Sequence, residues 1–235
     1  MRRHIRVCAA LTMIFAALLI GGRINSSEQQ AGGYQITDVE GTVVTFAHKP
    51  QRILTVSAGT DELMLGLVEP ERGEKLIGKM EDKLAEIRAK VAQVPEEKKH
   101  KSIALISIMV NYGGAGCTFD ELCNYTDSIN AKAAAGNRMG QEMTKEQLVA
   151  ANPDYLFFPS YEDGATNEEN YGRQYLEDPS LAQMTAVRER QIGHPWARYV
   201  YNLSQNIVYG IQETAWILYG DEFKQSRHEF LTAVE

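Results

Sequence analysis

Apolar and polar residues recur with several different spacings along this chain, and each spacing predicts a different kind of secondary structure. Residues 34–46 (YQITDVEGTVVTF) hold two short β-type runs around Glu40 and Gly41, which predicts a hairpin. Residues 52–56 (RILTV) are typical of a buried strand, and Thr60 is expected to cap the helix that follows.

The most regular spacing lies in residues 73–94, where apolar residues recur every three or four positions and many of the residues between them are Lys or Glu. This spacing predicts one amphipathic helix, about 33 Å long at 1.5 Å per residue. We expect this helix to pack on the rest of the protein through one apolar face, whose members are Leu76, Ile77, Met80, Leu84, Ile87, Val91 and Val94.

The second half of the chain alternates predicted strands with predicted helices. Apolar runs at 103–109 and 154–158 predict buried strands, and an irregular strand is expected over 190–200. The sequence therefore predicts an α/β fold, a three-layer sheet flanked by helices.

Short polar signals predict where the helices of this half begin and end. Thr118 to Glu121 and Thr144 to Gln147 match capping boxes, and Asn152-Pro153 should end the second of these helices. Asp178-Pro179 is expected to start a short helix. Ser204 should cap a closing helix that ends before Gly220.

The first residues of the chain predict a secretory signal peptide over 1–25. Arg2, Arg3 and Arg6 precede an uncharged stretch, 7–22, which is short for a transmembrane helix of about 20 residues. Gly22 stands where a lipoprotein would carry its lipidated cysteine, so no lipid can be attached there. We expect a periplasmic or extracytoplasmic protein, which stays membrane-tethered if the signal is not cleaved.

Composition and charge narrow the functional classes. The chain has 235 residues, of which 44% are hydrophobic, so it is expected to fold rather than stay disordered. It carries 24 Lys and Arg against 31 Asp and Glu, a net charge of −7. Such an acidic protein is a poor partner for a phosphate backbone, and we expect no binding of nucleic acid.

The usual signatures of catalysis and cofactor binding are missing from the sequence. The glycine-rich loop 111–116 fails the dinucleotide fingerprint because Phe119 occupies the third glycine position. Cys117 and Cys123 have no metal-binding partners and no favourable disulfide spacing, so both are expected to be buried packing residues. We expect no catalytic residue, no metal site and no resident cofactor.

Aromatic and polar side chains do gather in the loops after the predicted strands. Tyr112 and Tyr161 each follow one strand, and Trp196, Arg198 and Tyr199 form a third group. Ligands of open α/β sheets bind at the carboxyl ends of the strands. Each ring could equally be a packing residue, and the group as a whole is the candidate ligand-binding site.

The order of these motifs resembles the substrate-binding proteins of iron-chelate and cobalamin ABC importers, the type with a helical backbone between two lobes. The resemblance covers about 200 residues and is carried by several stretches in order: ITDVEGTVVTF, KPQRILTVSAGTDELMLGL, FDELCNYTDSINAKAAAG, MTKEQLVAANPDYLFFPSY and SQNIVYGIQETAWILYGDEF.

This resemblance implies a domain plan in which residues 26–72 are part of an N-terminal lobe, 73–95 the connecting helix and 103–235 the C-terminal lobe. Residues 69–72 lead almost directly into the connecting helix, so most of the N-terminal lobe is expected to be missing. The family docks its permease through an acidic residue in each lobe. Glu146, in the pattern that runs from Thr144 to Pro153-Asp154, matches the residue of the C-terminal lobe.

The resemblance also implies a function. We expect a monomeric extracytoplasmic protein that captures a small-molecule metal chelate, a ferric siderophore or haem, and hands it to an ABC permease. Arg198 would pair with anionic groups of the ligand, and the aromatic rings would pack on its apolar surface. The alternatives are a cobalamin-binding member of the family, a truncated relative with only a structural or protein-interaction role, and, last, an enzyme on this fold.

Overall fold

The computed structural model describes residues 34–37, 41–47, 70–109, 112–161, 166, 168–201, 204–226 and 229–232. They belong to two compact units, Met1–Leu54 and Thr55–Glu235, each described here on its own. The predicted signal sequence, the strand predicted over 52–56 and the helix after Thr60 lie outside these residues. Within them, no helix combines the length and apolar character that crossing a membrane requires.

The first unit contains the predicted hairpin. Strand β1 (Tyr34–Thr37) pairs antiparallel with β2 (Val43–Phe46), with Tyr34 opposite Phe46. Gly41 has φ +84°, a backbone angle that glycine adopts without strain, as a tight turn requires. The side chains of Val43 and Val44 are exposed.

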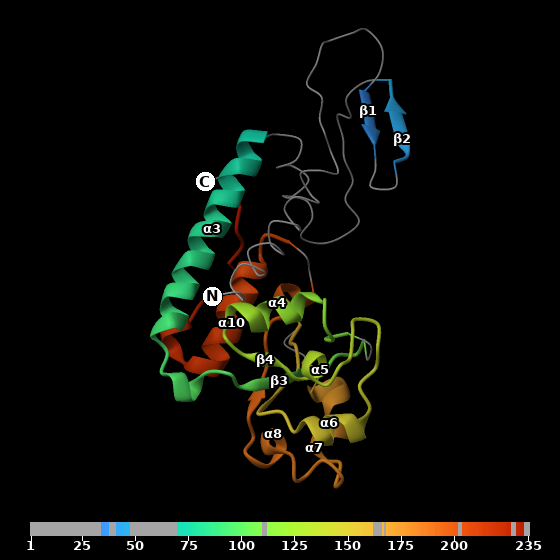
Figure 1. Ribbon diagram of the computed structural model, residues 1–235, viewed down its shortest axis with the longest axis vertical. Helices are drawn as coiled ribbons and strands as arrows, with labels where there is room; N and C mark the ends of the chain where they lie inside the picture. The colour runs from blue at the N-terminus through green and yellow to red at the C-terminus, as the bar shows by residue number, and fades with distance from the viewer. Residues whose placement is uncertain are drawn as a thin grey trace. The chain divides into compact units, whose positions relative to one another are not determined.

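Helix α3 (Pro70–Gln93) is the long amphipathic helix predicted from residue 73. It begins three residues earlier because proline suits the first helical position, where no partner for its missing N–H is needed. Leu76, Met80 and Leu84 pack in a cluster with residues of α10 (Ile207–Tyr219), which runs beside α3 in Figure 1. The apolar face is therefore docked, as expected.

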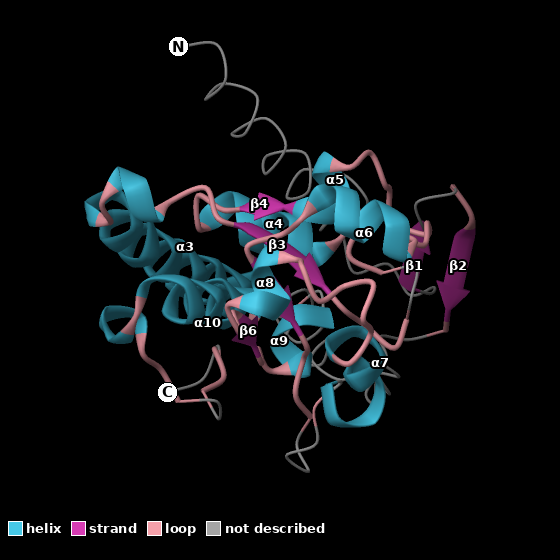
Figure 2. Ribbon diagram, turned by 90° about the horizontal axis from the view of Figure 1, so that it is seen from below, coloured by secondary structure: helices cyan, strands magenta, loops and turns pink. Residues whose placement is uncertain are grey.

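A parallel sheet forms the centre of the second unit, as Figure 2 shows. Its strands lie in the order β4 (Ile129–Asn130), β3 (Ser102–Leu105), β5 (Tyr155–Phe157) and β6 (Ile192–Gly193). All neighbouring pairs run parallel. Helices flank the sheet, which confirms the predicted α/β class.

Side chains that alternate along the strands separate the two faces of the sheet. Ala104 and Leu156 face a core cluster with Leu148 of α6 (Lys145–Ala151) and Ala186 of α8 (Thr185–Arg188). Phe157 points to the other face, where its ring meets that of Phe119 in α4 (Thr118–Tyr125). The described part of the unit also contains shorter elements: α5 (Ala131–Ala134), a π-helix Glu168–Gly172, α7 (Arg173–Leu176), α9 (Ala197–Tyr201) and 3₁₀ helices at Glu96–Lys98 and Asp221–Phe223.

Two predicted strands are wrong in length. The strand expected over 103–109 ends at Leu105, because the chain turns where the Ser107 hydroxyl accepts the N–H of Met109 at 3.0 Å. The strand expected over 190–200 holds only the two residues of β6. From Ala197 the chain is helical and forms α9.

The predicted helix starts are right in one case and wrong in three. The capping box at Thr144 is present, with Gln147 as its partner. Thr118 is instead the first helical residue of α4, and α10 begins after Asn206 rather than at a Ser204 cap. Asp178 accepts the N–H of Ser180 in a turn, so no helix starts there.

Candidate ligand-binding site

The carboxyl ends of β3, β5 and β6 meet at one edge of the sheet, because these strands run parallel. The loops after β5 and β6 are joined there by backbone hydrogen bonds. Ser160 donates its N–H to the Pro195 carbonyl at 2.8 Å and accepts the N–H of Ala197 at 2.7 Å. Helix α9 thus starts at the edge where open α/β sheets bind ligands.

Tyr112 lies against α9 with its hydroxyl already bonded. The hydroxyl donates to the Val200 carbonyl at 3.0 Å, and the ring meets Tyr201 edge-on, with 5.1 Å between centroids. Tyr201 in turn donates to the Ser107 hydroxyl at 2.9 Å, after β3. Burial raises the pKa of Tyr112 to about 12, so its hydroxyl is neutral at physiological pH.

Tyr161 is half-buried and directly follows Ser160, the residue that joins the β5 loop to α9. The structure therefore places it near the start of α9. Residues 162–165, which follow it in the loop, lie outside the described residues. A ligand-binding role for Tyr161 stays a prediction.

Trp196 and Tyr199 are buried in a core cluster in this structure, and a ligand-binding role for either ring stays a prediction. Trp196 is 4% exposed and Tyr199 is 0% exposed, and their rings pack at 87° with 4.7 Å between centroids. The Tyr199 hydroxyl donates to the Glu229 carbonyl at 2.7 Å, and the backbone N–H of Trp196 donates to the Glu213 carboxylate at 2.7 Å. Apolar packing around α9 explains why both rings are buried.

Arg198 lies at the border of this core and is half-buried. Its guanidinium carbon is 4.9 Å from the centre of the Phe230 ring and 5.8 Å from that of Trp196. Both distances are typical of cation–π contacts. The first turn of α9 thus holds a positive charge against two aromatic rings, an arrangement that can attract an anionic ligand.

Sequence reasoning missed a buried cation at the same edge of the sheet. Lys132 is only 5% exposed, and its ammonium group donates to the Tyr112 carbonyl at 2.8 Å. Burial lowers the pKa of Lys132, while the nearby negative charge of Glu142 opposes that shift. The sequence carries no signal for this residue, because a lysine between alanines is typical of an exposed helix face.

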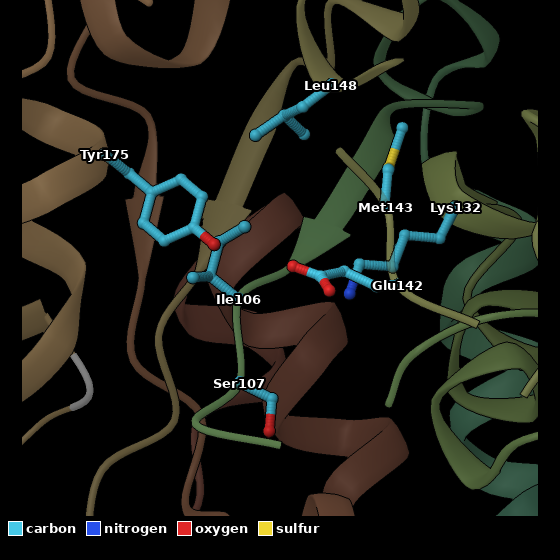
Figure 3. A pocket seen from close by; sticks show the side chains of 7 residues that line it. All are labelled: Ile106, Ser107, Lys132, Glu142, Met143, Leu148 and Tyr175. Carbon is cyan, nitrogen blue, oxygen red and sulfur yellow. The ribbon is translucent and has the colours of Figure 1, made fainter. Parts of the chain in front are cut away.

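Lys132 and Glu142 lie side by side at a small pocket, seen in Figure 3. The pocket encloses about 10 Å³, room for a single water molecule. It therefore cannot hold a chelate in this structure. Its lining consists of Ile106, Ser107, Lys132, Glu142, Met143, Leu148 and Tyr175.

Glu146 is exposed in the first turn of α6 and does not line this pocket. Its own backbone N–H and the Thr144 side chain lower the pKa of its carboxyl, so it is ionised at neutral pH. The capping box uses Thr144 and Gln147, which leaves the Glu146 carboxylate at the surface. The position is compatible with a docking contact and equally with an ordinary helix-end acid.

Metal-ligand clusters and cysteine chemistry give no further candidate site among the described residues. Among the described residues, no three His, Cys, Asp or Glu side chains come together as a metal site would require. Cys117 and Cys123 are both buried and free of a disulfide, as expected.

The comparisons with known proteins identify the family. A model described as periplasmic binding protein matches residues 37–194, more than half of the chain, and the chain belongs to that family. No curated protein is significantly similar to this sequence.

Solved structures agree with this fold at low sequence identity. A periplasmic haem-binding protein, RhuT of Roseiflexus sp. RS-1 in its apo form, matches with a TM-score of 0.55 and 22% identity over 67% of this chain and 59% of that one. An ABC-type Fe³⁺-hydroxamate transport protein of Saccharomonospora viridis gives 0.51 and 17%, over 67% and 53%. A periplasmic binding protein of Veillonella parvula gives 0.53 and 16%, over 62% and 50%. This chain thus spans less than two thirds of each.

Proposed function

We propose that this protein captures an iron chelate, a ferric siderophore or haem, outside the cytoplasm and delivers it to an ABC permease. The observation that carries the proposal is the position of Arg198, a cation in the first turn of α9 that lies against two aromatic rings at the carboxyl edge of the sheet. Family membership supports a binding protein rather than an enzyme. The named ligands of two similar structures, haem and Fe³⁺-hydroxamate, support an iron chelate as the ligand.

Capture would be non-covalent. The guanidinium of Arg198 would pair with carboxylate or hydroxamate oxygens, and the exposed parts of Tyr112 and Tyr161 would contact the apolar body of the ligand. No bond is made or broken in this mechanism. The protein would carry the bound ligand to the permease on the extracytoplasmic side of the membrane.

Tryptophan fluorescence tests the proposal, because Trp196 lies in contact distance of Arg198. The chain has two tryptophans, Trp196 and Trp216, so the Trp216→Phe variant leaves Trp196 as the only source of tryptophan fluorescence. Titration with haemin, ferric siderophores and cobalamin should give saturable quenching with an iron chelate. The Arg198→Ala variant should weaken that binding, and a flat titration with every ligand would refute the proposal.

Glu146 gives the proposal a second test, at the permease. If its carboxylate meets a basic residue of the permease, Glu146→Gln should weaken the association, and added salt should have less effect on the variant than on wild type. The change should cost at most about 1 kcal/mol of stability, because the two capping-box hydrogen bonds are made by Thr144 and Gln147. Glu81→Gln, at an exposed position of α3, is the charge-matched control. Identical retention of wild type and Glu146→Gln by the permease would end the docking role.

A second candidate is a relative of these proteins without transport function. The observation that favours it is partial coverage: this chain matches only 59% of the haem-binding protein's chain and 53% of the hydroxamate-transport protein's chain. Such a protein would keep the sheet as a structural or protein-interaction domain. It would bind none of the three ligand classes even at millimolar concentration, whereas a cobalamin-binding member would respond to cobalamin alone.

A further inference from the structure

The C-terminal segment of the second unit, residues 229–232, lies directly on the candidate site. The Phe230 ring packs against that of Trp196 with 5.7 Å between centroids at 64°, and the Arg198 guanidinium carbon lies 4.9 Å from the centre of the Phe230 ring. An aromatic side chain of the protein itself thus occupies the place beside a ring and a cation that a ligand ring would take.

Hydrogen bonds with α9, α3 and the turn before α10 hold this segment in place, among them one from the Gln205 side chain to the Leu231 carbonyl at 3.2 Å. The Tyr199 hydroxyl donates to the Glu229 carbonyl at 2.7 Å, and the N–H of Leu231 donates to the Asn206 side chain at 2.8 Å. Lys79 of α3 donates to the Thr232 carbonyl at 2.9 Å, and the segment runs beside α3 in Figure 1. The segment is therefore a specific contact, bonded at both of its ends.

The two apolar residues of the segment differ in burial. Leu231 is 9% exposed and joins the cluster of Trp196 and Tyr199, whereas Phe230 is 39% exposed. Burial in this cluster is reason enough for an apolar residue at position 231. Phe230 leaves more than a third of its surface in water, so core packing does not require an aromatic ring at this position.

We propose that residues 229–232 act as a built-in competitor, with Phe230 in the place of a ligand ring between Trp196 and Arg198. The ligand class that would displace it is a planar aromatic body that carries anionic groups. This inference rests on the proposed function, because it concerns the same site.

The competition has a measurable consequence. A ligand that binds only after the segment leaves has an apparent Kd equal to its intrinsic Kd divided by the fraction of molecules in which the site is open. Removing the Phe230 ring should raise that fraction. The contacts of the Phe230 ring with Trp196 and Arg198 favour the closed form and are lost when the ring is removed, so we expect affinity to rise about tenfold.

Haemin is the probe, since it is planar and carries two carboxylates. In the Trp216→Phe background, Phe230→Ala should bind haemin about tenfold more tightly than the parent, whereas Phe230→Tyr, which keeps the ring, should bind like the parent. Adding Arg198→Ala to Phe230→Ala should remove the gain. Hydrogen exchange provides an independent readout: in the parent, haemin should speed exchange of the Leu231 amide, because the bond to Asn206 breaks when the segment leaves.

The outcomes separate this inference from the proposed function. The competitor proposal is wrong if Phe230→Ala binds haemin no more tightly than the parent. It is also wrong if the gain in haemin affinity persists when Arg198→Ala is added. Haemin binding that leaves exchange at Leu231 unchanged would overturn it too. Failure of every variant to bind haemin, siderophore or cobalamin would overturn the proposed function as well.

Discussion

Tyr112 shows how burial sets the chemistry of a single side chain in this protein. Its hydroxyl is bonded to the Val200 carbonyl, and the partly apolar surroundings disfavour the phenolate. The group can therefore contribute a neutral donor and an aromatic surface, but no negative charge at physiological pH. The same reasoning applies to Lys132, where burial disfavours the charged form and the Tyr112 carbonyl provides a partner.

The Tyr112→Phe variant tests this description. At pH 7 it should lower the free energy of unfolding by about 1 kcal/mol, the usual value of one such hydrogen bond. The pKa of Tyr112 is raised above its ordinary value of 10 to about 12, so the folded state holds its proton more tightly than the unfolded state. The contribution of the hydroxyl is complete below pH 10 and is lost as pH rises through 12.

Urea unfolding of both proteins from pH 7 to pH 12 checks this expectation. The difference between wild type and Tyr112→Phe should be constant up to about pH 10 and then shrink. A difference that widens above pH 10 would mean that the Tyr112 phenolate is stabilised in the folded protein.

At the scale of elements, the long helix α3 owes its position to one face. Leu76, Ile87 and Val91 are each less than 5% exposed, while the charged residues between them stay in water. Salt bridges within the helix, such as Lys90 to Glu86 at 2.7 Å, are exposed and contribute little by comparison. Packing rather than charge therefore fixes α3 on α10.

Two substitutions in α3 separate packing from helix propensity. Ile87→Ala should lower the free energy of unfolding by about 2–4 kcal/mol, because a buried side chain is lost and leaves a cavity. Gly78→Ala should raise it by about 0.5–1 kcal/mol, since glycine is a poor helix former and an added Cβ meets no atom within 4 Å. Thermal or urea unfolding gives both values. No loss from Ile87→Ala would show that α3 does not depend on this packing.

The elements also show what the sequence could predict. The hairpin, α3 and the Thr144 capping box follow from local signals, a turn glycine, a 3.6-residue period and a Thr–Gln pair, and all three are present. Residues 190–200 lack any clear period, so the sequence predicts an irregular strand where the structure has α9. The burial of Trp196, Tyr199 and Lys132 depends on distant segments, so no local pattern distinguishes packing residues from binding residues there.

At the scale of the whole molecule, the two units differ in how much structure supports them. The described part of the first unit is a two-stranded hairpin with exposed valines, and such a hairpin is marginal by itself in water. The second unit has a sheet covered by helices on both faces. Its strands are consequently protected by a continuous core.

Native-state hydrogen exchange should report this difference directly. Amides of residues 34–46 should exchange markedly faster than those of β3 and β5, because the hairpin lacks a core of its own. Equal protection in both units would show that the hairpin has found stabilising contacts beyond its two strands.

Equilibrium dialysis of the purified protein against haemin, a ferric siderophore and cobalamin tests the central claim most directly, because it counts bound ligand without relying on a spectroscopic change. The account predicts saturable binding of one iron chelate at one molecule per chain, weakened by Arg198→Ala. Equal ligand concentrations on both sides of the membrane, for all three ligands, would contradict it.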